Sequence, residues 1–108
     1  MSDLSSKKCV PCSIGAIPLN ADDIQGFLNN LNEDWKIKDN KQIERTFKFK
    51  DFKEALEFTN KVGAIAEAEG HHPDLSLTWG KVIVTLWTHK INGLHANDFI
   101  LAAKIDSI

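Results

Sequence analysis

Three segments of the chain repeat their apolar residues at intervals of three and four, which is the period of an amphipathic helix. The first covers residues 21–33 behind Asn20, a residue well suited to cap a helix. The second covers residues 51–69, begins with an aspartate as its cap and ends before Gly70, and the third begins near residue 96. We therefore expect three helices. Their predicted apolar faces consist of Ile24, Phe27, Leu28 and Leu31; of Phe52, Ala55, Leu56, Thr59, Val62, Gly63 and Ala66; and of Ala96, Phe99, Ile100 and Ala103.

Between these helices the pattern changes to a period of two, which is typical of β-strands. Residues 35–37 begin a short strand, and the Asp-Asn pair at 39–40 offers a turn. In residues 43–50 an isoleucine, an arginine and two phenylalanines alternate with charged or hydroxyl side chains, so that one face is mostly apolar. Residues 75–79 alternate in the same way, and residues 82–89 return after a glycine-lysine turn. We therefore expect two hairpin-linked pairs of strands.

The predicted order is helix, two strands, helix, two strands, helix. Such an order favours an α+β fold, in which a four-stranded antiparallel sheet carries helices packed on one face. Trp87 and His89 are expected to project from the opposite face. Residues 1–18 show no periodicity and predict an extended N-terminal arm, so that residues 19–108 are expected to form a single domain.

Composition and charge argue against several classes of function. The chain has 108 residues, of which 43% are hydrophobic and 26% charged, as in an ordinary globular protein, and its formal net charge is −2. Lysine and arginine are spread through the sequence, so that nothing favours a nucleic acid or an anionic membrane as partner. No apolar run approaches the roughly 20 residues that span a bilayer. Residues 1–15 lack the apolar core of a signal peptide, which predicts a cytoplasmic location.

Both cysteines, Cys9 and Cys12, lie in the N-terminal arm. A C-x-x-C pair is compatible with a redox dithiol, with half of a zinc site or with two incidental thiols. A zinc site asks for further ligands at suitable spacing, and the chain holds no other cysteine. A redox motif of the thioredoxin kind opens a helix, whereas residues 13–15 do not resemble a helix start. An incidental or local structural role is the favoured interpretation, and a role as spare ligands stays open.

Two of the four histidines, His71 and His72, are adjacent and lie between the second helix and the strand that follows Pro73. A structural role is one interpretation, because the carbonyls at a helix C-terminus attract a cation. A zinc site is another, with His89 or Glu67 as third ligand, although adjacent histidines rarely point into one tetrahedral site. Acid-base chemistry asks only for imidazoles held by a rigid turn with a carboxylate nearby. The sequence therefore favours proton transfer over metal binding.

These histidines belong to a longer pattern. Glu67 is followed after three residues by His71-His72-Pro73, after five more by Trp79, after nine more by His89 and after eight more by Asp98. This spacing resembles the signature of the pterin-4a-carbinolamine dehydratases. The segments FKFKDFKEALEF before it and GLHANDFILAAKID after it are also similar to that family, so that the resemblance covers roughly residues 20–106.

The resemblance implies an enzyme, a hydro-lyase that removes water from 4a-hydroxytetrahydropterin to give quinonoid dihydropterin. This reaction recycles the cofactor of the aromatic amino-acid hydroxylases. The resemblance implies no metal and no organic cofactor: a base takes a proton from N5 of the pterin while an acid protonates the hydroxyl that leaves C4a. Proton transfer by a positioned group typically contributes about 10²–10⁴-fold to a rate, so that one or two well-placed imidazoles would supply much of the catalysis.

By the same resemblance, His71 and His89 are the catalytic proton-transfer pair, one on each side of the pterin ring. Glu67 positions or tunes a histidine, and His72 mainly holds the substrate. Lys90 stands where some members of the family carry an acidic residue. The expected substrate-binding residues are Gly70, His71, His72, Trp87, Thr88, His89 and Lys90, and no residue is expected to bind a metal.

Two roles are open for Asp98, which ends the signature. His95 and Asp98 have the spacing of a capping box, with His95 as N-cap and Asp98 as the third helical residue. Asp98 is also compatible with support of His89 or of the substrate. We favour capping, and we expect a structural or supporting role for Pro73. A core or interface role is the default for the three tryptophans, although each is able to stack on a pterin: Trp35, Trp79 and Trp87.

The resemblance also implies a homotetramer, a dimer of dimers built by edge-strand pairing and by helix packing. An exposed sheet edge and a small isolated core both favour such association. Some members of the family act as binding proteins, as dimerisation cofactors of a transcription factor or as assembly factors, and a purely structural interaction domain is a third interpretation. Degenerate relatives tend to lose the histidine set, which this chain retains in full, so that the enzyme is the favoured interpretation.

Overall fold

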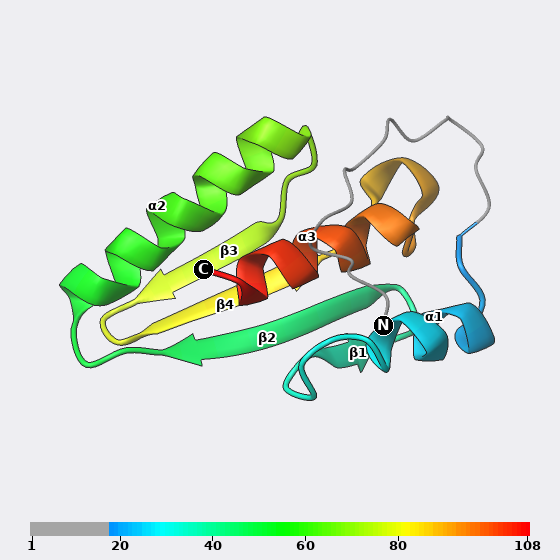
Figure 1. The fold of residues 1–108 in the computed structure, drawn as a ribbon, viewed down its shortest axis with the longest axis horizontal. Helices are drawn as coiled ribbons and strands as arrows, with labels where there is room; N and C mark the ends of the chain where they lie inside the picture. The colour runs from blue at the N-terminus through cyan, green and yellow to red at the C-terminus, as the bar shows by residue number, and fades with distance from the viewer. Residues whose placement is uncertain (1–17) are drawn as a thin grey trace.

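The computed structural model describes residues 18–108, which form one sheet and three α-helices. The elements are α1 (Ala21–Leu28), β1 (Lys36–Lys38), β2 (Gln42–Lys48), α2 (Phe52–Glu69), β3 (Asp74–Thr78), β4 (Lys81–Leu86), the 3₁₀ turn η2 (His89–Ile91) and α3 (Ala96–Asp106). The four strands are antiparallel and lie in the order β1-β2-β4-β3. Figure 1 shows α3 crossing in front of β4, with the long α2 beside it. The predicted α+β fold and its order of elements are confirmed.

Alternation along β2 and β4 separates a buried face of the sheet from an exposed one. Val82, Val84 and Leu86 in β4 are wholly buried, and so is Ile43 in β2. Directly paired residues of neighbouring strands point to the same face, and the register pairs Arg45 with Val84. The helices therefore cover the face predicted to be apolar, and Arg45 enters that face as a charged side chain.

Caps set the start of two helices, as the sequence predicts. The side chain of Asn20 accepts a hydrogen bond from the backbone N–H of Asp23 at 2.8 Å. The side chain of Asp51 accepts one from the backbone N–H of Glu54 at 2.9 Å. Each bond satisfies a donor that has no partner inside its own helix, which stabilises the first turn.

α1 ends earlier than the sequence predicts, at Leu28 rather than near residue 33. Just beyond this end, the side chain of Asn30 donates to the carbonyl oxygen of Gly26 at 3.1 Å, a local bond that competes with continuation of the helix. Leu31 was predicted on the apolar face of this helix. It lies beyond the helix end and still packs against the core. The prediction was therefore wrong about the length of the helix and right about the burial of its leucine.

The apolar face of α2 is displaced from the one that the sequence predicts. Phe52 and Leu56 were expected on it, but they are 44% and 40% exposed. A helix presents one stripe of residues to a sheet. When that stripe is shifted by one position along the sequence, different side chains are buried. Phe52 and Leu56 thus form an exposed apolar strip along α2. The residues of α2 that are buried or pack against the core are Ala55, Phe58, Val62, Ile65 and Ala66.

An ionic cluster ties β2 to the end of α3. Trp35 is only 3% exposed, and its indole Nε1 donates to both carboxylate oxygens of Asp106, at 3.0 and 2.8 Å. The guanidinium of Arg45 donates to the same carboxylate at 2.7 Å and lies 3.6 Å from that of Asp34. Burial raises the pKa of the Asp106 carboxyl above its ordinary value, while the bond from Trp35 and the charge of Arg45 act in the opposite direction. Arg45 and Trp35 therefore offset the cost of burying this carboxylate.

Removal of Arg45 tests the strength of this cluster. Arg45→Met should lower the free energy of unfolding by roughly 1.5–3 kcal/mol, because a largely buried carboxylate loses its charged donor. Lys50→Ala is the control, since it removes an ion pair with Glu54 at the surface of the protein and should cost less than about 1 kcal/mol. Urea unfolding of the two variants checks this expectation. Equal losses in both would show that the Arg45 cluster contributes no more than a surface pair.

Candidate active site

The end of α2 fixes the backbone in front of the two adjacent histidines. Gly70 has a φ of 66°, a left-handed conformation that glycine adopts without strain. The backbone N–H of His71 then donates to the carbonyl oxygen of Ala66 at 3.2 Å, which closes the last turn. Pro73 cannot continue the helix, and β3 begins at the next residue. The predicted short, constrained link that carries His71 and His72 is confirmed.

The ring of His71 meets a buried carboxylate. Its Nε2 lies 2.6 Å from Oδ1 of Asp98, whose side chain is 0% exposed. Oδ2 of the same carboxylate accepts from the hydroxyl of Thr88 at 2.8 Å and from the backbone N–H of His95 at 3.0 Å. Three partners from three segments of the chain therefore satisfy one buried carboxylate, as the burial of such a group requires.

Asp98 combines helix capping with a contact to a histidine. It is the third residue of a capping box at the start of α3, with His95 as the N-cap, as predicted. The ring Nδ1 of His95 accepts from the backbone N–H of Asn97 at 3.1 Å. Asp98 was also compatible with support of His89, but its side-chain bonds within residues 18–108 go to His71 and to the groups already described. Capping is confirmed, and the histidine contacted differs from the one considered.

Glu67 contacts His72. Its Oε1 lies 2.6 Å from Nε2 of His72, and both side chains are mostly exposed. An exposed pair of this kind adds little free energy, because water screens the charges and both side chains lose freedom. Glu67 is therefore placed to orient the second histidine of the pair at the surface of the site, and Asp98 orients the first.

His89 follows β4 and begins η2, and its ring lies against an indole. The centroids of the His89 and Trp87 rings are 4.1 Å apart, with 40° between the ring planes. The indole Nε1 of Trp87 donates to Oδ2 of Asp74 at 3.0 Å, which anchors the indole beside the histidine. The default role for Trp87 was the core or an interface; the structure places it half-buried beside His89. Lys90, the next residue of η2, is exposed.

Thr88 joins the two parts of the site. Thr88 is 4% exposed, and its backbone N–H donates to the carbonyl oxygen of Gly93 at 2.8 Å. Its hydroxyl donates to Asp98, the carboxylate that contacts His71. Because Thr88 directly precedes His89, the segment that carries one predicted catalytic histidine is attached to the carboxylate that contacts the other.

Asp74 and the hydroxyl of Thr88 are parts of the site that the sequence did not predict. A signal for Asp74 exists in the β3–β4 hairpin. A two-residue turn at 79–80 pairs Asp74 with Thr85. This register places Asp74 diagonal to Trp87 on the same face of the sheet. The contact of the Thr88 hydroxyl depends on how the chain folds after β4, and local sequence patterns carry no signal for that.

No group of three histidine, cysteine or acidic side chains within residues 18–108 is arranged to hold a metal ion. Cys9 and Cys12 lie outside the described residues, so that their expected incidental role stays a prediction. Within the described chain, Nε2 of His71 and Nε2 of His72 each meet a carboxylate oxygen. The site therefore offers imidazoles with hydrogen-bonded partners.

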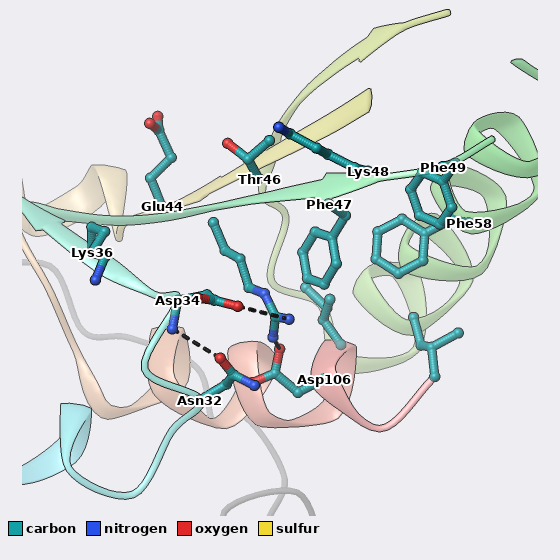
Figure 2. A pocket seen from close by; sticks show the side chains of 13 residues that line it. Asn32, Asp34, Lys36, Glu44, Thr46, Phe47, Lys48, Phe49, Phe58 and Asp106 are labelled. Atoms are coloured by element: carbon teal, nitrogen blue, oxygen red, sulfur yellow. Dashed lines mark hydrogen bonds and ion pairs between the residues drawn. The ribbon is translucent and has the colours of Figure 1, made fainter. Parts of the chain in front are cut away.

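A cavity of about 750 Å³ opens elsewhere, between β2 and the end of α3, and no histidine lines it. Figure 2 shows Asp34 and Asp106 toward one end and Phe47 and Phe58 toward the other. Arg45, which also lines it, is already paired with both aspartates. Its Nε has no hydrogen-bond acceptor among the described residues, but the guanidinium lies over the ring of Phe47, 4.4 Å from the centroid. These contacts give Arg45 a structural role. The histidines are therefore a better candidate for the functional site than this cavity.

The histidine site has the parts that proton transfer needs. His71 and His89 come from different segments and have different neighbours, a carboxylate and an indole. A carboxylate bonded to an imidazole orients the ring and stabilises the imidazolium that forms when the ring takes a proton. Among the described residues His71 has such a carboxylate and His89 does not, and a pair of imidazoles with different surroundings is suited to take a proton at one atom of a substrate and give a proton at another.

Comparison with known proteins relates the chain to one family. The model of the family described as pterin 4 alpha carbinolamine dehydratase matches residues 17–108. A protein of Alkaliphilus metalliredigens named "Putative pterin-4-alpha-carbinolamine dehydratase" is 55% identical over 106 residues, which cover 98% of this chain and 96% of that protein. A protein of the same name from Rickettsia bellii is 50% identical over 103 residues, which cover 95% of this chain and 91% of that protein.

Solved structures share the fold. The crystal structure of a transcriptional coactivator/pterin dehydratase from Brucella melitensis has a TM-score of 0.77 at 33% identity, over 83% of this chain and 96% of that one. A pterin dehydratase-like protein identified as a RuBisCO assembly factor in the alpha-carboxysome has a TM-score of 0.58 at 20% identity, over 68% of this chain and 86% of that one, and shows similarity of fold alone. The chain therefore belongs to the pterin 4 alpha carbinolamine dehydratase family.

Proposed function

We propose that this chain dehydrates 4a-hydroxytetrahydropterin to quinonoid dihydropterin, with His71 and His89 as the proton-transfer pair. The family and the names of the relatives support the reaction. The observation that carries the assignment of residues is the 2.6 Å contact between His71 and the fully buried carboxylate of Asp98. That contact holds one imidazole in a defined orientation, which is what general acid-base catalysis requires of a side chain.

In the proposed reaction His71 is the base. It takes the proton from N5 of the pterin, the electron pair of that N–H bond forms the double bond to C4a, and the bond from C4a to oxygen breaks with its electron pair on the oxygen. Protonated His89 gives its proton to this oxygen, which leaves as water. We give His71 the role of base because the carboxylate of Asp98 stabilises the imidazolium that it becomes. Exchange with solvent, to which His89 is exposed, restores both protonation states.

The remaining residues of the site hold the substrate in this proposal. His72 is exposed beside the reacting histidine and is oriented by Glu67, so that its ring is available to a ligand. Glu67 acts on catalysis only through His72. The other proposed contacts with the pterin come from backbone groups around Gly70, Trp87 and Thr88, and from Lys90.

Single substitutions separate these roles. His71→Ala and His89→Ala should each lower kcat at least about tenfold, whereas His72→Ala should mainly raise KM, because ground-state binding is lost there. His95→Thr is the matched control: it changes a histidine that caps α3, and threonine is also a good cap, so that kcat should stay near the wild-type value. The measurement is stopped-flow dehydration of freshly made carbinolamine, with the uncatalysed rate subtracted. Wild-type kcat in both the His71→Ala and the His89→Ala protein would exclude this pair.

A protein-binding role is the second candidate function. One observation favours it, the exposed apolar strip of Phe52 and Leu56 on α2. The Brucella melitensis protein is described as a transcriptional coactivator as well as a pterin dehydratase, so that a second role of this kind has a parallel in a relative. Because the chain retains the complete histidine set, dehydratase activity remains the first candidate function.

We also propose that the chain forms a homotetramer, a dimer of dimers. β3 is an edge strand, and Leu75 on it is 38% exposed. Pairing of two such edges would satisfy the backbone groups that an edge strand leaves open. The strip of Phe52 and Leu56 would then pack between dimers, because apolar side chains on a helix surface favour association.

Charged substitutions on α2 test this assembly. The double variant Phe52→Glu/Leu56→Glu should convert the tetramer to dimers, because it places charges in the apolar contact. Lys53→Glu is the control, since it introduces the same residue at an exposed position of the same helix and should leave the tetramer intact. Light scattering at micromolar concentrations measures both. A monomeric wild-type protein would contradict the assembly, and an unchanged tetramer in the double variant would remove α2 from the interface.

Within residues 18–108 no helix is long and apolar enough to cross a membrane. The cytoplasmic location and the lack of a nucleic-acid partner rest on the sequence alone and stay predictions. The same holds for the lack of bound metal, which elemental analysis of the purified protein would measure, and for the boundary between the N-terminal arm and the domain.

A further inference from the structure

Few polar side chains are buried in this fold, and one of them is Thr88. Among residues 18–108 the buried polar or charged residues are Thr88, Asn97 and Asp98. Buried hydroxyls nearly always have a hydrogen-bond partner, and the partner of Thr88 is Oδ2 of Asp98, at 2.8 Å. Thr88 therefore acts on the carboxylate that contacts His71, from a position that solvent scarcely reaches.

We propose that Thr88 is a positioning residue: its hydroxyl fixes the carboxylate of Asp98 and thereby fixes the tautomer and the orientation of His71. The effect on catalysis rests on the proposed function, in which His71 is the base. The effect on the ring of His71 does not depend on any activity.

Counting donors around Asp98 gives the tautomer. An ionised carboxylate accepts hydrogen bonds and donates none. Oδ2 already accepts from the hydroxyl of Thr88 and from the backbone N–H of His95, and Oδ1 faces Nε2 of His71. Nε2 must therefore carry the hydrogen, and the lone pair of the neutral ring lies on Nδ1. Nδ1 of His71 is thus the atom that takes a proton from the substrate.

Thr88 also sets the position of this carboxylate relative to His89. Its backbone N–H is bound to the carbonyl oxygen of Gly93, so that the segment before His89 is held on its main chain. Its hydroxyl then links that segment to Asp98 and, through Asp98, to His71. Without the hydroxyl, Oδ2 keeps only the backbone N–H as donor, and the carboxylate is free to turn about its Cβ–Cγ bond. Oδ1 would then no longer face Nε2 of His71 in every molecule, and the ring would lose the acceptor that fixes its tautomer.

Three variants isolate this hydroxyl. Thr88→Val keeps the branched shape of the side chain and removes the hydroxyl, whereas Thr88→Ser keeps the hydroxyl. Thr85→Val is the matched control, because the hydroxyl of Thr85 also donates to a carboxylate at 2.8 Å, that of Glu44 in β2. The same atoms are thus removed from a neighbouring position of the chain, outside the proposed site.

The first readout is NMR of the histidine ring nitrogens, at a pH where the rings are neutral. Wild-type His71 should carry its hydrogen on Nε2, and Thr88→Val should show a mixture with the Nδ1 form. The second readout is kcat and KM. Thr88→Val should lower kcat about tenfold with little change in KM, while Thr88→Ser and Thr85→Val stay within about threefold of wild type. Recovery of kcat in Thr88→Ser would distinguish positioning from packing, because serine restores the hydrogen bond to Asp98 but not the methyl group.

Two results would overturn the proposal. The first is a wild-type His71 with its hydrogen on Nδ1, a measurement that needs no variant and is therefore safe from misfolding. The second is a folded Thr88→Val protein with both the spectrum of His71 and kcat unchanged. A wild-type protein without dehydration above background, in which Thr88→Val still alters the tautomer of His71, would end the proposed function and leave the positioning of His71 by Thr88 supported.

Discussion

The arrangement of the site depends on one buried carboxylate. Asp98 is wholly excluded from solvent, and an unpaired charge in such a place costs several kcal/mol, so that the fold has to supply donors for both of its oxygens. The donors are the hydroxyl of Thr88, the backbone N–H of His95 and the ring of His71. They belong to the end of β4, the start of α3 and the link between α2 and β3. Satisfying one side chain therefore fixes three segments relative to one another.

α3 is the element that brings this carboxylate into the core, and polar contacts hold both of its ends. At its N-terminus Asp98 completes the capping box, where a negative charge is also favoured by the helix dipole. At its C-terminus Asp106 is bound by Trp35 and Arg45. The residue that caps the helix is also the residue that orients His71. Stability and the proposed catalysis thus share one carboxylate, and a change at Asp98 is expected to affect both.

Local rules predicted most of the backbone and few of the side-chain contacts. The caps at Asn20 and Asp51 and the helix end at Gly70 follow from the conformational preferences of those residues, and the structure confirms them. The error at Phe52 and Leu56 has a different origin, because spacing of three and four defines several overlapping stripes and tertiary packing decides which one is buried.

The pairing of carboxylates with histidines was harder to predict than the histidines themselves. Glu67 lies one helical turn before His71, yet it contacts His72, since the chain leaves the helix at Gly70 and the ring of His71 meets Asp98 instead. Asp98 is 27 positions from His71 in the sequence and meets it only because α3 packs against the end of α2. Contacts of this range depend on the packing of whole elements, for which a single sequence holds no local signal.

The account is tested most directly by kcat/KM of Asp98→Asn, measured together with the thermal midpoint on one preparation. Asparagine replaces one of the two acceptor oxygens with a donor, so that at least one of the three groups that bind Asp98 loses its partner. We predict a folded protein with a lower midpoint and with kcat/KM reduced about tenfold or more, which corresponds to a loss of about 1.4 kcal/mol of transition-state stabilisation. A folded Asp98→Asn protein with a lower midpoint and wild-type kcat/KM would show that Asp98 only caps α3, and it would contradict the account.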